Sequence, residues 1–106
     1  MATKVNFTID QGADLSKLIE FTLTPVLDLS TYTARGSMRK HYGSNTAYTL
    51  TCAITSNTSV TVTLNNSNTA AIPAGRYVYD IEVVSSGNVV TRAAEGMVTV
   101  YPEVTR

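Results

Sequence analysis

The chain has 106 residues, eight basic and eight acidic side chains, and 43% hydrophobic residues. This length suits one domain with a single two-layer core, so we expect one domain over residues 1–106. The lack of a basic surplus argues against nucleic acid as a partner. No apolar run has the length of a signal peptide or a bilayer span, so we expect folding in a cytosol without a membrane partner.

The first part of the chain predicts two strands separated by a turn. Alternating apolar residues are typical of half-buried strands, and residues 10–14 are rich in turn formers. Pro25 ends the second strand, because proline cannot continue an interior ladder. A connector over residues 26–30 follows, in which we expect Asp28 or Ser30 to bond nearby backbone. The predicted inward residues are Val5, Phe7 and Ile9 in a strand over residues 4–9, then Ile19, Phe21 and Leu23.

A third strand is predicted over residues 32–40, followed by a loop over residues 41–46. Arg35, Ser37 and Arg39 alternate with Ala34, Gly36 and Met38, so the two sets lie on opposite faces. The small Ala34 and Gly36 predict close packing against a bulky neighbour, such as Tyr77 or Tyr79.

The middle of the chain predicts two more strands and one helical turn. Alternation over residues 48–54 and 60–64 indicates the strands, and residues 56–58 form the turn between them. Over residues 65–71, an Asn or Ser suits the cap of a short helical turn that Pro73 ends.

The region from residue 71 to residue 101 predicts a long β-hairpin, the spine of the fold. Tyr77, Tyr79, Ile81 and Val83 alternate with polar residues, as in a half-buried strand. Residues 85–88, Ser-Ser-Gly-Asn, suit a tight turn, and a second strand runs back over residues 89–100. Glu95-Gly96 interrupts its pattern and predicts a β-bulge.

Seven strands at spacings of roughly 8 to 14 residues indicate an all-β fold. We therefore expect an immunoglobulin-like antiparallel β-sandwich with one short helical turn. Tryptophan is absent and cysteine occurs once, so the Cys-Trp-Cys pattern of antibody domains is missing. Ala74 to Tyr77, at the start of the sixth strand, resembles the tyrosine-corner position of such folds.

The titratable residues do not form a catalytic pattern. Cys52 is interpreted as a small buried hydrophobe, with a thiol nucleophile activated by His41 as the alternative. Asp10 and Asp14 form a solvated turn or a weak calcium pair. We therefore expect no catalytic residue, metal, cofactor or small-molecule substrate.

One basic cluster stands out in the third predicted strand and the loop after it: Arg35, Arg39, Lys40 and His41. Arg35 and Arg39 project to the same side. They suit ion pairs with Asp80 or Glu82 across the sheet, or a contact with a partner.

Three motifs resemble a family of small virion proteins of tailed phages that infect marine and freshwater bacteria, including cyanobacteria. A more distant similarity is to the immunoglobulin-like N-terminal domain of phage baseplate upper proteins. The resemblance spans Phe7 to Arg106. It rests on a connector (Asp28, Leu29, Ser30, Tyr32), a strand (Ala74, Gly75, Tyr77, Tyr79, Asp80, Ile81, Glu82) and a returning strand (Glu95, Gly96, Val98, Thr99, Val100).

The resemblance implies a non-enzymatic structural protein of the virion, assembled in the host cytoplasm, in the tail or baseplate region. The baseplate proteins carry long additional domains, so only the role of a virion building block is carried over. Its partners would be other virion proteins, in a homo-oligomer or multi-copy assembly. The expected contact residues are Arg35, Arg39, Lys40, His41 and Tyr42, with Glu103 and Arg106 in the tail.

Two alternative functions remain open. The first is a capsid decoration or neck protein, which differs from the tail assignment only in its position in the particle. The second is a carbohydrate-binding β-sandwich, in which Tyr42, Tyr48 and Tyr101 would stack on sugar rings. Such a platform requires these aromatic side chains to be exposed on the same side.

Overall fold

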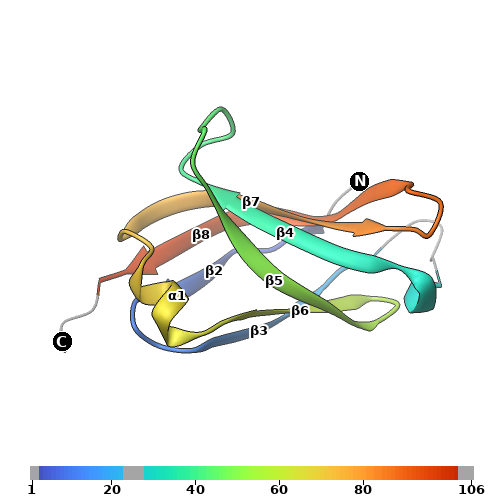
Figure 1. Cartoon of the computed structure of the whole chain (residues 1–106), viewed down its shortest axis with the longest axis horizontal. Helices are drawn as coiled ribbons and strands as arrows, with labels where there is room; N and C mark the ends of the chain where they lie inside the picture. The colour runs from blue at the N-terminus through green and yellow to red at the C-terminus, as the bar shows by residue number, and fades with distance from the viewer. Residues whose placement is uncertain (1–2, 23–27, 103–106) are drawn as a thin grey trace.

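The computed structural model describes residues 3–22 and 28–102 (Figure 1). Strands dominate this part of the chain, as the sequence predicts. In chain order the elements are β1 (Thr3–Lys4), β2 (Phe7–Asp10), β3 (Leu15–Glu20), the 3-10 turn η1 (Leu29–Thr31), β4 (Thr33–Arg39), β5 (Ala47–Ser56), β6 (Ser59–Leu64), α1 (Asn66–Ala70), β7 (Gly75–Val84) and β8 (Val90–Tyr101).

The strands form one mixed sheet in the order β1-β8-β7-β4-β5-β6-β3, with β2 also paired to β8. The sheet curls into two layers because β5 crosses from one to the other (Figure 1). Residues 47–50 pair with β4, whereas residues 51–56 pair with β6. The first layer contains β1, β2, β8, β7 and β4, and the second contains β6 and β3. The expected all-β, immunoglobulin-like sandwich is confirmed.

The N-terminal strand departs from the antiparallel arrangement, since both β1 and β2 run parallel to β8. It also divides in two at Val5 and Asn6, which raises the strand count from seven to eight. The Asn6 side chain explains the break. Its Oδ1 accepts a hydrogen bond of 3.0 Å from the Met97 amide, which replaces a backbone partner with a side chain.

The core lies between the two layers and contains the predicted inward residues of the described strands. Tyr77 and Tyr79 of the spine hairpin are buried there, and Phe7 packs edge-on against Tyr79 at 5.0 Å between ring centres. Leu23, Pro25 and the first part of the predicted connector lie outside the described residues. The largest fully buried side chains are Ile9, Ile19, Leu29, Met38, Leu50, Val60, Val62, Tyr79, Ile81, Val83, Val98 and Val100.

Three predicted local features are confirmed at the turns. Asp28 accepts a hydrogen bond of 3.1 Å from the Ser30 amide, and Asn65 caps α1 by accepting one of 2.8 Å from the Asn68 amide. The Tyr77 hydroxyl donates to the Pro73 carbonyl at 2.6 Å. This bond reaches back four residues from the start of β7, as a tyrosine corner does.

The predicted bulge at Gly96 is wrong, because the irregularity lies at Ala93. Ile81 pairs with Ala94 and Glu82 with Arg92, so Ala93 is the extra residue. Gly96 instead permits close contact between backbones. Its φ is +159°, and a Cβ there would collide with the Val5 carbonyl. The Tyr79 hydroxyl also donates to that carbonyl, at 2.5 Å.

The neighbour predicted for Gly36 is also wrong. A Cβ on Gly36 would lie 2.9 Å from the Cys52 Sγ and 3.2 Å from the Asp80 carbonyl oxygen, with Ile81 as the third neighbour. The reason is that β5 leaves β4 at this point, which brings Cys52 against Gly36 in place of a tyrosine. Within residues 3–22 and 28–102, no helix has the length and apolar character needed to cross a membrane.

Candidate functional site

The outer face of the first layer gathers charged side chains on neighbouring strands, and we call it the charged face. It follows from alternation, since β7 buries every second residue and its outward residues pair with residues of β4 and β8. The register then places outward residues side by side in rows across the sheet. Its members are Arg35, Ser37, Arg39, Arg76, Val78, Asp80, Glu82, Arg92, Glu95, Met97 and Thr99.

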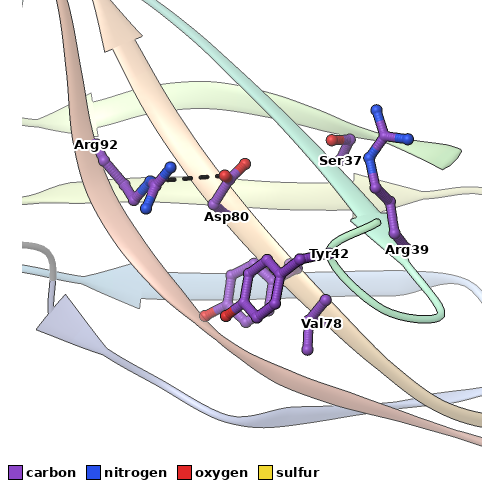
Figure 2. Close-up of a pocket in the computed structure, with 7 residues that line it drawn as sticks. Ser37, Arg39, Tyr42, Val78, Asp80 and Arg92 are labelled. Atoms are coloured by element: carbon purple, nitrogen blue, oxygen red, sulfur yellow. Dashed lines mark ion pairs between the residues drawn. The ribbon is translucent and has the colours of Figure 1, made fainter. Parts of the chain in front are cut away.

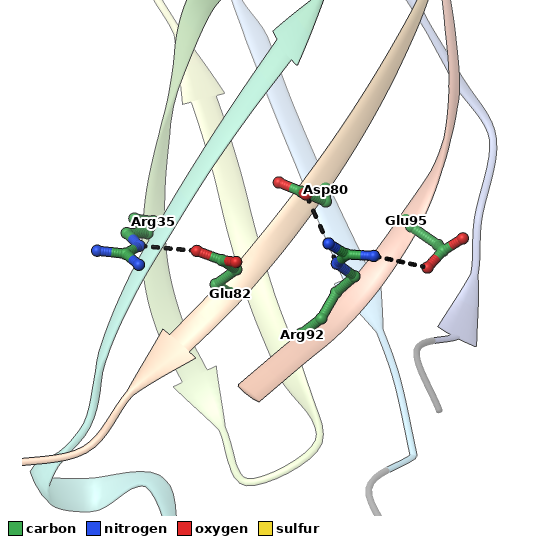
Figure 3. Close-up of polar contacts among 5 residues, drawn as sticks. All are labelled: Arg35, Asp80, Glu82, Arg92 and Glu95. Atoms are coloured by element: carbon green, nitrogen blue, oxygen red, sulfur yellow. Dashed lines mark hydrogen bonds and ion pairs between the residues drawn. The ribbon is translucent and has the colours of Figure 1, made fainter. Parts of the chain in front are cut away.

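Three ion pairs link charged side chains of β4, β7 and β8 on the charged face (Figure 3). Arg35 Nε lies 2.9 Å from Glu82 Oε1 on the adjacent strand. Arg92 bridges two carboxylates, at 3.6 Å from Asp80 and 3.8 Å from Glu95. Opposite charges on adjacent strands are a common stabilising device of sheets. The predicted pairing of Arg35 across the sheet is confirmed. The Glu82 carboxylate of the same chain neutralises its charge.

The surroundings of Asp80 shift the pKa of its carboxyl. Burial raises the pKa of its carboxyl above 3.8, and the nearby Glu82 and Glu95 add to this, whereas Arg92 and Arg39 act in the opposite direction. Burial therefore outweighs the attraction of the two arginines in setting the pKa of Asp80.

A hollow of about 230 Å³ adjoins Asp80 on the charged face (Figure 2). Tyr42 projects over it from the loop between β4 and β5, and 73% of this residue is exposed. Exposed tyrosines are enriched at protein interfaces, where the ring supplies contact area with few rotatable bonds. The lining residues are Ser37, Arg39, Tyr42, Val78, Tyr79, Asp80 and Arg92.

A second hollow of about 360 Å³ lies across β7 and β8 from the first. Val78 lines the first hollow and Met97 lines the second, and these two residues are paired across the strands. They form an apolar ridge between the hollows. The second hollow is lined by Asn6, Phe7, Thr8, Arg76, Met97 and Thr99.

Each hollow contains an arginine that makes no ion pair with the described residues. Arg39 Nη1 donates to the Ser44 carbonyl at 2.6 Å, which orients the side chain without neutralising it. Arg76 is exposed on β7, and no carboxylate of the described chain lies within salt-bridge distance of it. Arg39 and Arg76 therefore carry the charges on this face that are available to a partner.

The predicted basic cluster does not act as one patch. Arg35 and Arg39 share the charged face, but Lys40 Nζ lies 5.0 Å from the ring centre of the buried Tyr77. His41 is exposed in the following loop, next to Tyr42. The predicted contact residues Glu103 and Arg106 lie outside the described residues.

The sequence-based interpretation of Cys52 as a packing residue fits its surroundings. It is half-buried, its Sγ donates to the Leu50 carbonyl at 3.4 Å, and burial raises its pKa to about 11. A nucleophilic thiol needs a lowered pKa. The Cys52 Sγ lies against Gly36, in the middle of β4, whereas His41 lies in the loop after that strand. The alternative of a thiol activated by an imidazole is therefore not supported.

The acidic turn has a structural role. Asp14 Oδ1 accepts a hydrogen bond of 2.7 Å from the Asn66 amide at the start of α1. The buried Thr69 of α1 donates to the Ala13 carbonyl at 2.9 Å, which ties the helix to the same turn. In the part of the chain that the structure describes, no three His, Cys, Asp or Glu side chains gather as metal ligands would.

The three tyrosines of the carbohydrate-binding alternative do not form one platform. Tyr48 packs edge-on against Tyr77, with 5.8 Å between ring centres, and belongs to the inner side of β5. Tyr101 is 51% exposed but lies at the end of β8, four residues beyond Met97. Tyr42 is therefore the one member of the three that lines the first hollow.

Sequence reasoning missed Arg76, Arg92 and Met97 as parts of this site. Their outward positions follow from the same alternation that identified the spine hairpin. What the sequence lacked was the register that places Met97 beside Val78, since the extra residue at Ala93 shifts the pairing.

Comparisons with known proteins bear on the fold alone. No family model matches the chain, and no curated protein matches it in sequence. Similar solved structures include a glycoside hydrolase-like protein from Bacteroides vulgatus (9% identity, TM-score 0.53), an internalin-like protein from Listeria monocytogenes (15%, 0.53) and an adhesin from Streptococcus sanguinis (14%, 0.52). The matches cover 92%, 94% and 92% of this chain but only 17%, 28% and 55% of those proteins.

Proposed function

We propose that the chain is a non-enzymatic structural module of a tailed-phage particle, in the tail or baseplate region, and that it acts through protein-protein contacts. The charged face is the surface that makes the contact. Its partners are other virion proteins, and the module is present in several copies.

The observation that carries the proposal is the composition of the charged face. Arg39 and Met97 on the sheet and Tyr42 in the adjoining loop line the two hollows, and tyrosine, methionine and arginine are enriched at protein interfaces. Met97 is 39% exposed in the free chain although it is apolar. A partner that covered it would gain apolar burial and reach the unpaired arginine.

The assignment to a virion rests on the three sequence motifs. The structure gives several of their residues packing roles: Leu29 is buried behind η1, Tyr77 makes the tyrosine corner, and Gly96 lets β8 approach Val5. The motifs therefore describe how such a module is built, and they support kinship with the family without identifying a catalytic function.

Mass spectrometry of purified particles tests the proposal directly. Particles from the phage or prophage that encodes the chain are washed at high salt and analysed for copies per particle. We expect the chain at a fixed copy number. Its presence in the lysate but absence from washed particles would reject the virion role, and antibody labelling on the head would favour the decoration or neck alternative.

Light scattering of the purified chain over a range of concentrations identifies the kind of contact. A stable closed oligomer would point to contacts between copies. A monomer at all concentrations would mean that the partner is a different virion protein, which is the result that an accessible charged face favours.

A further inference from the structure

We infer that the two hollows and the apolar ridge between them bind an extended, acidic segment of a partner protein, with one carboxylate over each hollow. This inference rests on the proposed function in one respect only, namely that the charged face contacts a protein. It goes further by specifying that the bound segment of that protein is extended and acidic.

Charge complementarity is the first argument. The first hollow holds the guanidinium of Arg39, which makes no ion pair with the described residues, beside the ion pair of Arg92 with Asp80. The second hollow holds Arg76 without an acidic lining residue, which leaves one positive charge. A guanidinium binds a carboxylate with two parallel hydrogen bonds, so each hollow suits one Asp or Glu of the partner.

The ridge is the second argument. Val78 and Met97 are paired on β7 and β8 and separate the two hollows, so an apolar side chain of the partner can rest on them between its two carboxylates. In an extended segment, alternate side chains point to the same side. The pattern Glu-x-Leu-x-Glu therefore presents the required carboxylate, apolar and carboxylate groups together.

The rest of the charged face explains why other sites on it bind less well. Arg35 is neutralised by Glu82, and Arg92 is shared between Asp80 and Glu95. These pairs form a rim on one side of the hollows. Tyr42 lines the first hollow from the loop between β4 and β5 (Figure 2). A partner segment is thus guided onto the ridge.

Fluorescence anisotropy with two labelled, terminally blocked peptides tests the inference. The probe is Ser-Glu-Ser-Leu-Ser-Glu-Ser, and its counterpart carries Gln in place of both Glu residues. We expect the full chain to bind the Glu peptide and to bind the Gln peptide at least about tenfold more weakly, with the difference shrinking as salt is added.

Matched variants locate the binding. Arg39→Gln and Arg76→Gln are each expected to weaken binding of the Glu peptide about fivefold, whereas Lys17→Gln, which removes an exposed cation on β3 in the second layer, leaves it unchanged. Met97→Gln is expected to weaken both peptides alike. Thermal melting of each variant confirms that it is folded.

Three results would overturn the inference: equal binding of the two peptides, equal weakening by Lys17→Gln, or tighter binding of single-stranded DNA that depends on the same arginines. The outcome is separate from that of the particle analysis. Peptide binding by a chain that is absent from particles would reject the virion role alone, and a chain present in particles that ignores the Glu peptide would reject the acidic partner alone.

Discussion

The two outer faces of the sandwich are built from the same alternation but carry different chemistry. The charged face has seven titratable side chains, two hollows and an apolar ridge. The outer face of the second layer, which we call the threonine face, carries hydroxyl groups, and Glu20 is the one charged residue at its outward positions. Those positions are Ser16, Leu18, Glu20, Thr51, Ala53, Thr55, Thr61 and Thr63.

This difference shows that sheet alternation fixes where a side chain points but leaves its function to the residue type. On the threonine face the side chains satisfy one another, as in the 2.6 Å hydrogen bond between the Thr55 and Thr61 hydroxyls. On the charged face, Arg39 and Arg76 have no carboxylate partner in the described chain. Substitutions should therefore affect the two faces unequally.

The largest effect is expected for Gly96→Ala, which tests how the edge of the charged face is anchored. The new Cβ would collide with the Val5 carbonyl, so β1 must move away from β8. We expect a loss of about 3 kcal/mol in the free energy of unfolding, measured by urea denaturation. Gly87→Ala, in the β7-β8 turn where a Cβ would meet only Ser85 at 3.8 Å, is the control and should cost much less. Equal losses for the two variants would contradict the close approach at Gly96.

Gly36→Ala tests the packing at the point where β5 separates from β4. The Cβ would lie 2.9 Å from the Cys52 Sγ, and overpacking of this kind costs about 2 kcal/mol in unfolding free energy. Cys52→Ala removes the closest of these atoms, so the same substitution in a Cys52→Ala background should cost less. A double-mutant cycle by denaturation measures the difference. Additive losses would mean that the Asp80 backbone, and not Cys52, sets the limit.

The hairpin, the tyrosine corner and the cap of α1 were predictable because each depends on residues close in sequence. Tyr77 needs only Pro73, four residues away, and Asn65 needs only Asn68. The position of Asp28 beside Ser30 is equally local. In such cases the residue types nearly determine the geometry.

The failures depend on contacts between distant segments. Gly96 was expected to mark a bulge, but its neighbour is Val5, which lies more than ninety residues earlier in the chain. The parallel pairing of β1 and β2 with β8 requires knowledge of the whole topology. The basic cluster divides because Lys40 lies over the buried Tyr77 while Arg39 turns outward. Alternation could not reveal these pairings.

A pair of charge substitutions tests the contrast between the faces themselves. Glu82→Lys would place three cations in one row, between Arg35 and Arg92, and should cost about 1 kcal/mol in unfolding free energy at low salt. Thr63→Lys on the threonine face should change stability by less than about 0.5 kcal/mol. Added salt should reduce the first loss and leave the second unchanged. A salt-insensitive loss for Glu82→Lys would show that its ion pair with Arg35 does not matter.

The smallest effect concerns pH and Asp80. Because burial raises the folded-state pKa of Asp80, its ionised form opposes folding above that pKa, and this penalty is relieved as pH falls through it. The stability of Asp80→Asn relative to the native chain should therefore be highest at neutral pH and should decline towards pH 4. Thermal melting of both proteins across this range measures the difference. A difference that grows as pH falls would mean that Asp80 is stabilised as the carboxylate.

Incorporation of variant chains into particles tests the central claim most directly. Particles assembled with Arg39→Gln/Arg76→Gln on the charged face are compared with particles assembled with Thr51→Gln/Thr63→Gln on the threonine face, and copies per particle are counted by mass spectrometry. We predict that the first variant is lost or strongly depleted while the second is retained at the native copy number. Retention of the first and loss of the second would contradict the account, because it would place the contact on the threonine face.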